Sequence, residues 1–208
     1  MLNFEELDSI FKGELYYNNS TKHEAQKIIY STDASVFQER PIAVAIPKTK
    51  EDIIQCILFA GKNNITLIPR AAGTSLAGQV VGKGMVVDIS KYFTHIIELN
   101  VEEKWVRAQP GVIRDDLNIY LKPFGLMYAP ETSTANRAMI GGMIGNNSCG
   151  LHSIVWGDAR KHLLEANVIL SDGTEVVFKN ISAQEFVEKT KQKKLEGSIY
   201  KKLNDLLS

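Results

Sequence analysis

Two glycine-rich segments, RAAGTSLAGQ (residues 70–79) and IGGMIGNNSCG (residues 140–150), decide how this 208-residue chain is expected to fold. They hold six of its fifteen glycines, mixed with Ala, Ser, Thr or Asn, and neither contains an acidic residue. Glycine lets a ligand approach the backbone closely and reaches the positive φ values that turn successive N–H groups toward one point. We therefore expect two loops that bind a large anionic ligand mainly by main chain, and a dinucleotide fits best.

Composition is that of an ordinary globular protein, with 44% apolar and 23% charged residues. The 24 Lys and Arg balance 24 Asp and Glu, so no global field favours nucleic acid as a partner. The basic run at residues 189–194 is typical of a solvated linker rather than a nucleic-acid patch. No apolar segment approaches the roughly 18 residues of a transmembrane helix. We expect a cytoplasmic protein and leave attachment to a membrane surface open.

The chain has two cysteines, too few for a disulfide framework. Cys56 lies in a helical apolar pattern and is expected in the core, whereas Cys149 lies in the second glycine-rich segment. No spacing typical of metal ligands is present, so we expect a reducing compartment and no metal.

Apolar runs and turn residues predict an alternation of helices and strands. Thr49 and Asp52 have the spacing of a helix-capping pair. A strand–helix–strand unit then leads directly into the first glycine-rich segment, at the strand end where open α/β sheets bind ligands. In chain order, we expect helices over 4–11 and 22–30, a strand over 41–47, a helix over 49–63, and a strand over 65–69.

The remaining elements complete an α+β fold with two lobes, split near residues 90–95, each contributing one glycine-rich segment. Asp172-Gly173 between two apolar runs predicts a hairpin. The last helix, opening at Ser198, carries an apolar face at Ile199, Leu203, Leu206 and Leu207. This face either packs back on the domain or marks the chain as the front piece of a longer protein. The other expected elements are a strand over 85–89, strands over 96–99 and 104–108, a helix over 113–121, and hairpin strands over 162–170 and 175–178.

Two common nucleotide-binding motifs do not fit. Gly78-Gln-Val-Val-Gly-Lys83 is one residue short of a Walker-type phosphate loop and lacks its metal-binding hydroxyl. The Gly-x-Gly-x-x-Gly spacing of the Rossmann fingerprint is absent.

A further set of motifs is more specific. After the strand that ends in Pro69, the chain carries RAAGTS (70–75), APETS (129–133), IGGM (140–143), NNSCG (146–150), WG (156–157) and ILSDG (169–173), in that order. This order resembles the FAD-binding domain of the vanillyl-alcohol oxidase / p-cresol methylhydroxylase (PCMH) family over roughly two-thirds of the chain, from about residue 41 to 178. The NNSCG form is most similar to the D-lactate and D-2-hydroxyacid dehydrogenase branch. Several members of that branch carry a substrate domain and an iron–sulfur domain after the flavin domain.

The resemblance implies four segments and a set of cofactor contacts. An N-terminal helical extension would span residues 1–40, a first FAD-binding lobe 41–92, a second lobe 93–180, and a C-terminal helical segment 181–208, with FAD between the lobes. Main-chain N–H groups of the first segment would bind the diphosphate, and the later residues would lie near the flavin, ribityl chain or adenine. The implied contacts are Arg70, Ala71, Ala72, Gly73, Thr74, Ser75, Pro130, Thr132, Ser133, Gly141, Gly142, Asn146, Ser148, Gly150, Val168 and Ile169.

The resemblance also implies an activity. Many relatives attach FAD through a histidine where this chain has Thr74, so we expect non-covalent FAD. The family's FAD accepts a hydride from a 2-hydroxy acid, and the catalytic residues are expected in a substrate domain outside this chain. Alone, the chain would then show little turnover. The alternative is a non-catalytic flavin or nucleotide-binding module. His152 is expected as a structural donor rather than a base, and Cys149 as a packing residue.

Overall fold

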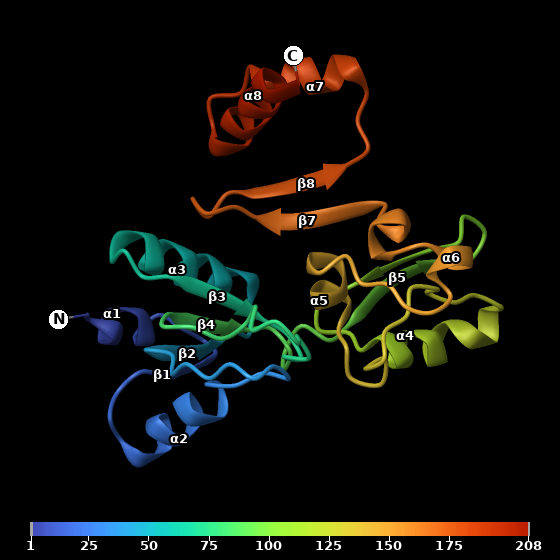
Figure 1. The fold of residues 1–208 in the computed structure, drawn as a ribbon. Coiled ribbons are helices and arrows are strands. Elements are labelled where there is room, and N and C mark those ends of the chain that lie inside the picture. Colours follow the sequence, from blue (N-terminus) through green and yellow to red (C-terminus); the bar gives the residue numbers. More distant parts are fainter. Residues whose placement is uncertain (1, 208) are drawn as a thin grey trace. The chain divides into compact units, whose positions relative to one another are not determined.

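The computed structural model describes residues 2–207, and its contacts divide the chain into one unit up to His162 and another from Leu163 onward (Figure 1). The expected split near residues 90–95 therefore does not separate these two units. It falls instead between two sheets inside the first unit. The lobe boundaries that the family resemblance implies stay a prediction.

The first unit is built on a four-stranded sheet in the order β1-β2-β4-β3. β1 is antiparallel to β2, whereas β2 and β3 both run parallel to β4. The strands predicted over 41–47, 65–69 and 85–89 are confirmed; β1, only three residues long, was not predicted. The strands are β1 (Glu14–Tyr16), β2 (Ala43–Ile46), β3 (Leu67–Arg70) and β4 (Met85–Asp88).

Alternate residues of these strands pack on opposite faces of the sheet, as the period of a strand requires. Met85 and Val87 share one apolar cluster with Cys56 of α3, which is fully buried as expected. Val44 and Val86 belong to the cluster on the other face. The helices of this part are α1 (Phe4–Asp8), α2 (Thr21–Ile29) and α3 (Lys50–Lys62) (Figure 1).

The start of α3 confirms the predicted capping pair. Thr49 Oγ1 accepts a hydrogen bond from the Asp52 N–H at 3.2 Å, and Asp52 Oδ2 accepts one from the Thr49 N–H at 3.1 Å. Asp52 is 2% exposed, and its carboxylate also accepts from the main-chain N–H groups of Lys12 and Lys48. The buried charge is therefore satisfied by main chain, which fixes where β2 ends and α3 begins.

The rest of the first unit has its own apolar core, formed by Val112, Leu117, Leu121 and Ile140. The antiparallel pair β5–β6 and helix α4 confirm the predicted elements. The second glycine-rich segment differs from the prediction, because its first six residues form helix α5 rather than a loop. The elements are β5 (Ile96–Asn100), β6 (Trp105–Ala108), α4 (Arg114–Leu121), η1 (Lys122–Phe124), α5 (Ile140–Gly145), α6 (Ser153–Trp156) and η2 (Ala159–His162).

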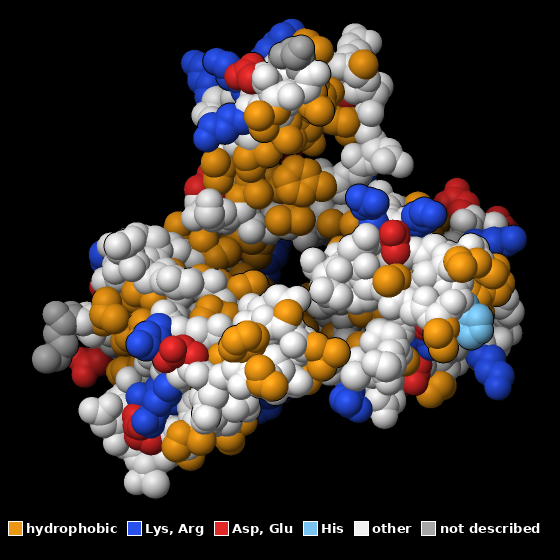
Figure 2. Space-filling view, viewed as in Figure 1, with side chains coloured by type: hydrophobic (Ala, Val, Ile, Leu, Met, Phe, Trp, Pro, Cys, Tyr) orange, Lys and Arg blue, Asp and Glu red, His pale blue; other side chains and the backbone are white. Residues whose placement is uncertain are grey.

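The second unit consists of the predicted hairpin, β7 (Glu165–Ile169) and β8 (Glu175–Lys179), followed by α7 (Ala183–Thr190) and α8 (Leu195–Leu207). Gly173 in the turn has φ +80°, as expected for Asp-Gly. Helix α7 was not predicted, and it takes in the start of the basic run that was expected to be a linker. Helix α8 begins three residues before Ser198. Its Leu203, Leu206 and Leu207 are exposed, and apolar surface is visible over this unit in Figure 2.

Candidate functional site

The main chain of the first glycine-rich segment presents free hydrogen-bond donors. Within residues 2–207, the backbone N–H groups of residues 71–75 have no acceptor. Three carbonyl groups of the segment are paired: Gly73 O accepts from the Ala34 N–H at 3.2 Å, Arg70 O from the Ile89 N–H at 3.0 Å, and Gly78 O from the Val81 N–H at 3.2 Å. Residues 71–75 are half-buried. A fixed backbone with consecutive free N–H groups is an anion-binding arrangement.

The Arg70 side chain supports this loop from within the protein. Its Nη1 donates to the Thr32 carbonyl at 2.8 Å, and its guanidinium lies 5.1 Å from the centroid of the Tyr30 ring. Tyr30 in turn donates its hydroxyl to the buried Asp88 at 2.5 Å. Gly73 has φ +68°, and a Cβ atom there would lie 2.6 Å from Arg70 Nη2. Arg70 therefore packs against the loop, while its contact with a cofactor stays a prediction.

The two glycine-rich segments meet in the first unit. A Cβ atom placed on Gly142 would lie 3.7 Å from the Cβ atom of Ala71. Gly142 is exposed, and its N–H has no acceptor in the part of the chain that is described. Any larger side chain at position 142 would therefore extend toward the first segment and its free N–H groups.

In the rest of the second segment, most main-chain N–H groups already donate hydrogen bonds to acceptors within the protein. The Ile140 N–H donates to Val112 O at 2.9 Å and the Gly141 N–H to Pro110 O at 2.8 Å. The Asn146 and Ser148 N–H groups bond back into α5, to Gly142 O and Met143 O. This differs from our expectation that both segments offer free amides.

Two of its glycines are needed for packing. A Cβ atom on Gly141 would lie 2.5 Å from Pro110 Cβ, and one on Gly150 would lie 2.2 Å from Glu131 Cγ. The space that we expected these glycines to leave for a cofactor is thus occupied by protein. Contact with a cofactor through their main chain stays a prediction.

Segment 129–133 is held by its neighbours. Pro130 is fully buried, and its carbonyl accepts from Arg114 Nε at 3.2 Å. Thr132 Oγ1 lies 3.0 Å from Thr134 Oγ1 and accepts from the Thr134 N–H at 3.1 Å. Ser133 is exposed. Burial of Pro130 leaves Ser133 as the most accessible of the three residues that we expected near the flavin ring.

The remaining predicted contacts are divided between the units. Asn146 Nδ2 lies 3.4 Å from Ser148 Oγ in the first unit, which is a long hydrogen bond. Val168 and Ile169 lie in β7 of the second unit and pair with Val176 and Glu175 of β8. Their contact with the adenine ring of FAD stays a prediction.

A contact between Glu131 and His152 was not predicted. Glu131 Oε1 lies 3.0 Å from the main-chain N and 2.7 Å from Nδ1 of His152. The His152 N–H first, and then its side chain, lower the pKa of the Glu131 carboxyl. His152 acts here as a structural partner, which agrees with the role expected for it. The two residues are 21 positions apart, and no local pattern signals such a pair.

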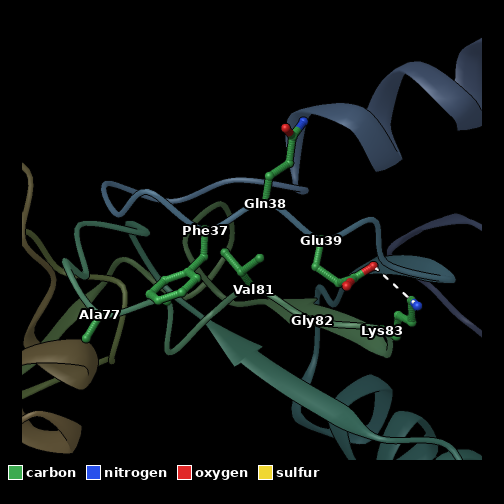
Figure 3. Close-up of a pocket in the computed structure, with 8 residues that line it drawn as sticks. Phe37, Gln38, Glu39, Ala77, Val81, Gly82 and Lys83 are labelled. Atoms are coloured by element: carbon green, nitrogen blue, oxygen red, sulfur yellow. Dashed lines mark ion pairs between the residues drawn. The ribbon is translucent and has the colours of Figure 1, made fainter.

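An open groove of about 430 Å³ lies beside the first segment. In Figure 3, the Phe37 ring lies between Ala77 and Val81, and a dashed line joins Glu39 to Lys83. Gly78, with φ +73°, is seated on Phe37, because a Cβ atom there would lie 2.7 Å from the ring. The groove is thus lined by Ala77 and Gly78 of the first segment and not by residues 71–75.

Other kinds of site receive no support in residues 2–207. This stretch contains no group of three or more His, Cys, Asp and Glu side chains placed to hold a metal ion. None of its helices is long and apolar enough to cross a membrane. Cys149 is a free, exposed thiol, which differs from the packing residue that we expected at this position.

Comparison with known proteins gives a consistent set of matches. A family model described as an FAD binding domain matches residues 41–179. D-2-hydroxyglutarate dehydrogenase of Haemophilus influenzae is 38% identical over 88% of this chain and 18% of its own length. The protein of that name from Escherichia coli K12 is 41% identical over 72% of this chain and 15% of its own length. Mitochondrial D-lactate dehydrogenase [cytochrome] of Kluyveromyces lactis is 32% identical over 81% of this chain and 28% of its own.

Solved structures give the same fold. 6-Hydroxy-D-nicotine oxidase from Arthrobacter nicotinovorans superposes with a TM-score of 0.71 at 20% identity, covering 85% of this chain and 38% of that one. Carbohydrate oxidase from Microdochium nivale gives a TM-score of 0.72 at 19% identity, over 88% of this chain and 38% of the other. The chain thus spans less than a third of the curated relatives described above.

Proposed function

This chain belongs to the family of FAD-binding domains, and from this premise we propose that it is the flavin-binding part of a dehydrogenase that oxidises a D-2-hydroxy acid. The proposal is supported by relatives named for D-2-hydroxyglutarate and D-lactate. D-2-Hydroxyglutarate and D-lactate share a carboxylate beside a secondary hydroxyl, and that shared chemistry is the substrate class proposed here.

The observation that carries the cofactor assignment is the row of free N–H groups at residues 71–75, with the bare main chain of Gly142 beside it. A diphosphate spreads its negative charge over several oxygens, so consecutive main-chain donors suit it without a bound cation. The hydroxyl groups of Thr74 and Ser75 would add donors at the same place. The residues present therefore fit the diphosphate of FAD.

Bound FAD would supply the acceptor for the hydride that leaves the substrate's α-carbon. The main-chain N–H groups of residues 71–75 would bind its diphosphate and orient it. Oxidation of a 2-hydroxy acid also requires a cation for the carboxylate and a base for the hydroxyl proton. We propose that a substrate domain of the whole protein supplies both groups, and that an iron–sulfur domain accompanies it. The D-2-hydroxyglutarate dehydrogenase relatives, of which this chain covers 15–18%, have room for such domains.

We propose that FAD is held without a covalent bond. In many members of the family that this chain resembles, a histidine at the position of Thr74 forms a covalent bond to FAD. A threonine hydroxyl cannot form that bond. Acid denaturation of the FAD-loaded protein followed by ultrafiltration should release all of the yellow colour into the filtrate. A flavin that stays on the polypeptide after denaturation would refute this proposal.

The cofactor proposal is tested by titrating the 208-residue chain with FAD, ADP and riboflavin and following flavin absorbance and fluorescence. FAD should bind and ADP should compete with it, because both carry a diphosphate, whereas riboflavin should bind far more weakly. Equal binding of riboflavin and FAD would contradict a site built around the diphosphate. In the whole protein, bound FAD that no D-2-hydroxy acid reduces would favour a non-catalytic flavin-binding module.

We also propose a cytoplasmic location, supported by the lack of a disulfide framework in a chain with two free cysteines. Cell fractionation tests this location and, in the same experiment, any attachment to a membrane surface. Recovery of the whole protein in the membrane pellet at high salt would contradict a purely cytoplasmic location.

A further inference from the structure

One carboxylate joins two stretches of the candidate site that are far apart in sequence. Glu131 lies in segment 129–133, and His152 is the N-terminal cap residue of α6. Glu131 Oε1 is 3.0 Å from the His152 main-chain N and 2.7 Å from its Nδ1. Gly150 completes the contact, because its absent side chain leaves room for Glu131 Cγ and Glu131 O. The end of the second glycine-rich segment thus packs against Glu131.

The surroundings keep this carboxylate ionised. His152 lowers its pKa most, and the Arg114 guanidinium lowers it further. Arg114 also donates to Pro130 O and pairs with Asp115 at 2.9 Å, so its charge is partly compensated. Since the pKa of Glu131 is lower in the folded chain than the ordinary value of 4.5, the stability that the ionised carboxylate contributes is present above pH 4.5 and is lost as the pH falls through the lowered pKa.

Segment 129–133 and the end of the second segment are each internally fixed. Pro130 is fully buried, and Thr132 is bonded to Thr134. The Gly150 N–H donates to Ser153 Oγ at 2.8 Å. Each stretch is therefore held by contacts of its own, and the Glu131–His152 contact joins the two stretches.

Resting on the proposed function, we propose that Glu131 and His152 are positioning residues of the flavin site: their contact holds segment 129–133 against residues 150–152 so that bound FAD takes a single orientation. We do not propose that either residue contacts the substrate. The contact acts through its neighbours Thr132, Ser133 and Ser148, which the family resemblance puts at the flavin. Loss of the contact should therefore alter the environment of the ring as well as the affinity.

The test compares wild type with Glu131→Ala, Glu131→Gln and His152→Ala in the 208-residue chain, by FAD titration and by the positions of the visible flavin absorption bands. Glu131→Ala should weaken FAD binding about tenfold, the size expected for charge-assisted hydrogen bonds, and should shift the bands. His152→Ala keeps the main-chain bond and should lose about threefold. Glu131→Gln, whose amide oxygen can still accept the His152 main-chain N–H, should restore the band positions. Glu188→Ala removes an exposed ion pair with Lys191 in the second unit and is the matched control, expected to bind as wild type.

The outcomes separate this inference from the proposed function. If wild type binds FAD and Glu131→Ala has the same affinity and bands, the inference is overturned and the proposed function stands. A wild-type chain that binds no FAD would overturn both. Should Glu131→Ala fail to fold, His152→Ala decides, because its side chain is 65% exposed and its main chain is unchanged. Unaltered affinity and bands in that variant would overturn the inference.

Discussion

The two glycine-rich segments are similar in composition and opposite in the use of their main chain. In the first segment, the N–H groups of residues 71–75 are free. In the second, most N–H groups donate hydrogen bonds within α5 or to Pro110 O and Val112 O. Their glycines differ in the same way. Gly73 and Gly78 have a positive φ that other residues rarely adopt, and the atoms nearest to them belong to side chains. Gly141 and Gly150 have no positive φ, and a side chain there would meet main-chain atoms of Pro110 and Glu131. A glycine-rich sequence therefore indicates either a ligand-binding backbone or close packing, and only the hydrogen bonds distinguish the two.

Gly142 is the exception in the second segment, since it faces Ala71 of the first. Its neighbour in the same helix, Gly145, has no atom within 4 Å of the position that a Cβ atom would take. The two glycines form a matched pair in α5. One borders the candidate diphosphate site and the other borders open space.

The largest effect is expected from Gly142→Leu. Its side chain would fill the space next to residues 71–75 and should weaken FAD binding by about 100-fold, because overpacking of a close contact costs roughly 1–3 kcal/mol. Gly145→Leu, in open space, should bind FAD within about twofold of wild type. FAD titration of both variants checks this. Equal losses in the two variants would remove the distinction between Gly142 and the rest of α5.

Gly141→Ala should affect folding more than ligand binding. Its new methyl group would lie 2.5 Å from Pro110 Cβ, a ring atom that cannot turn away. We expect a loss of about 1–3 kcal/mol in the free energy of unfolding, measured by urea denaturation. Gly145→Ala is the control and should be neutral or stabilising by up to about 1 kcal/mol, since alanine favours helix over glycine. If Gly141→Ala is as stable as Gly145→Ala, the close packing of position 141 against Pro110 does not require a glycine.

The smallest effect concerns the sheet that leads into the first segment, whose strand β1 carries an ion pair. Glu14 pairs with Lys91 and accepts hydroxyl hydrogen bonds from Tyr92 at 2.6 Å and Tyr16 at 2.7 Å. The Lys91 contact first, and then the Tyr92 and Tyr16 hydroxyls, lower the pKa of Glu14 from 4.5 to about 2. A lowered carboxyl pKa stabilises the fold above pH 4.5, and this contribution is lost as the pH falls toward 2.

Glu14→Gln should therefore reduce the free energy of unfolding at pH 7 by about 1–2 kcal/mol, after allowing for solvent screening of a partly exposed group. Below pH 4.5 its stability should fall less steeply than that of wild type. Denaturation curves at pH 7 and pH 3 test both statements. Parallel pH profiles in the two proteins would show that Glu14 carries no such contribution.

The sequence predicted the first segment's surroundings better than the second's, for physical reasons. Strand periodicity and the Thr49–Asp52 spacing are local signals, so three of the four strands of the sheet and the start of α3 were found. Helix α5 was missed because Gly141, Gly142 and Gly145 each disfavour a helix by about 1 kcal/mol relative to alanine. Tertiary contacts override this preference, since Ile140 and Met143 are buried and the first N–H groups bond to Val112 O and Pro110 O.

The Glu131–His152 contact was missed for a different reason. It joins residues separated by 21 positions, and nothing in either local sequence marks them as partners. The meeting of Ala71 with Gly142 was predictable because both segments were assigned to one ligand. Composition alone, however, could not tell which of the second segment's glycines would face the first segment.

Amide resonances of the chain, followed by NMR during FAD addition, test the central contrast most directly. The N–H signals of residues 71–75 and of Gly142 should shift and their exchange with solvent should slow. The amides of Gly141, Asn146 and Ser148 already donate within the protein, so FAD should slow their exchange with solvent far less. FAD binding that leaves residues 71–75 unchanged, or that perturbs the second segment alone, would contradict the account.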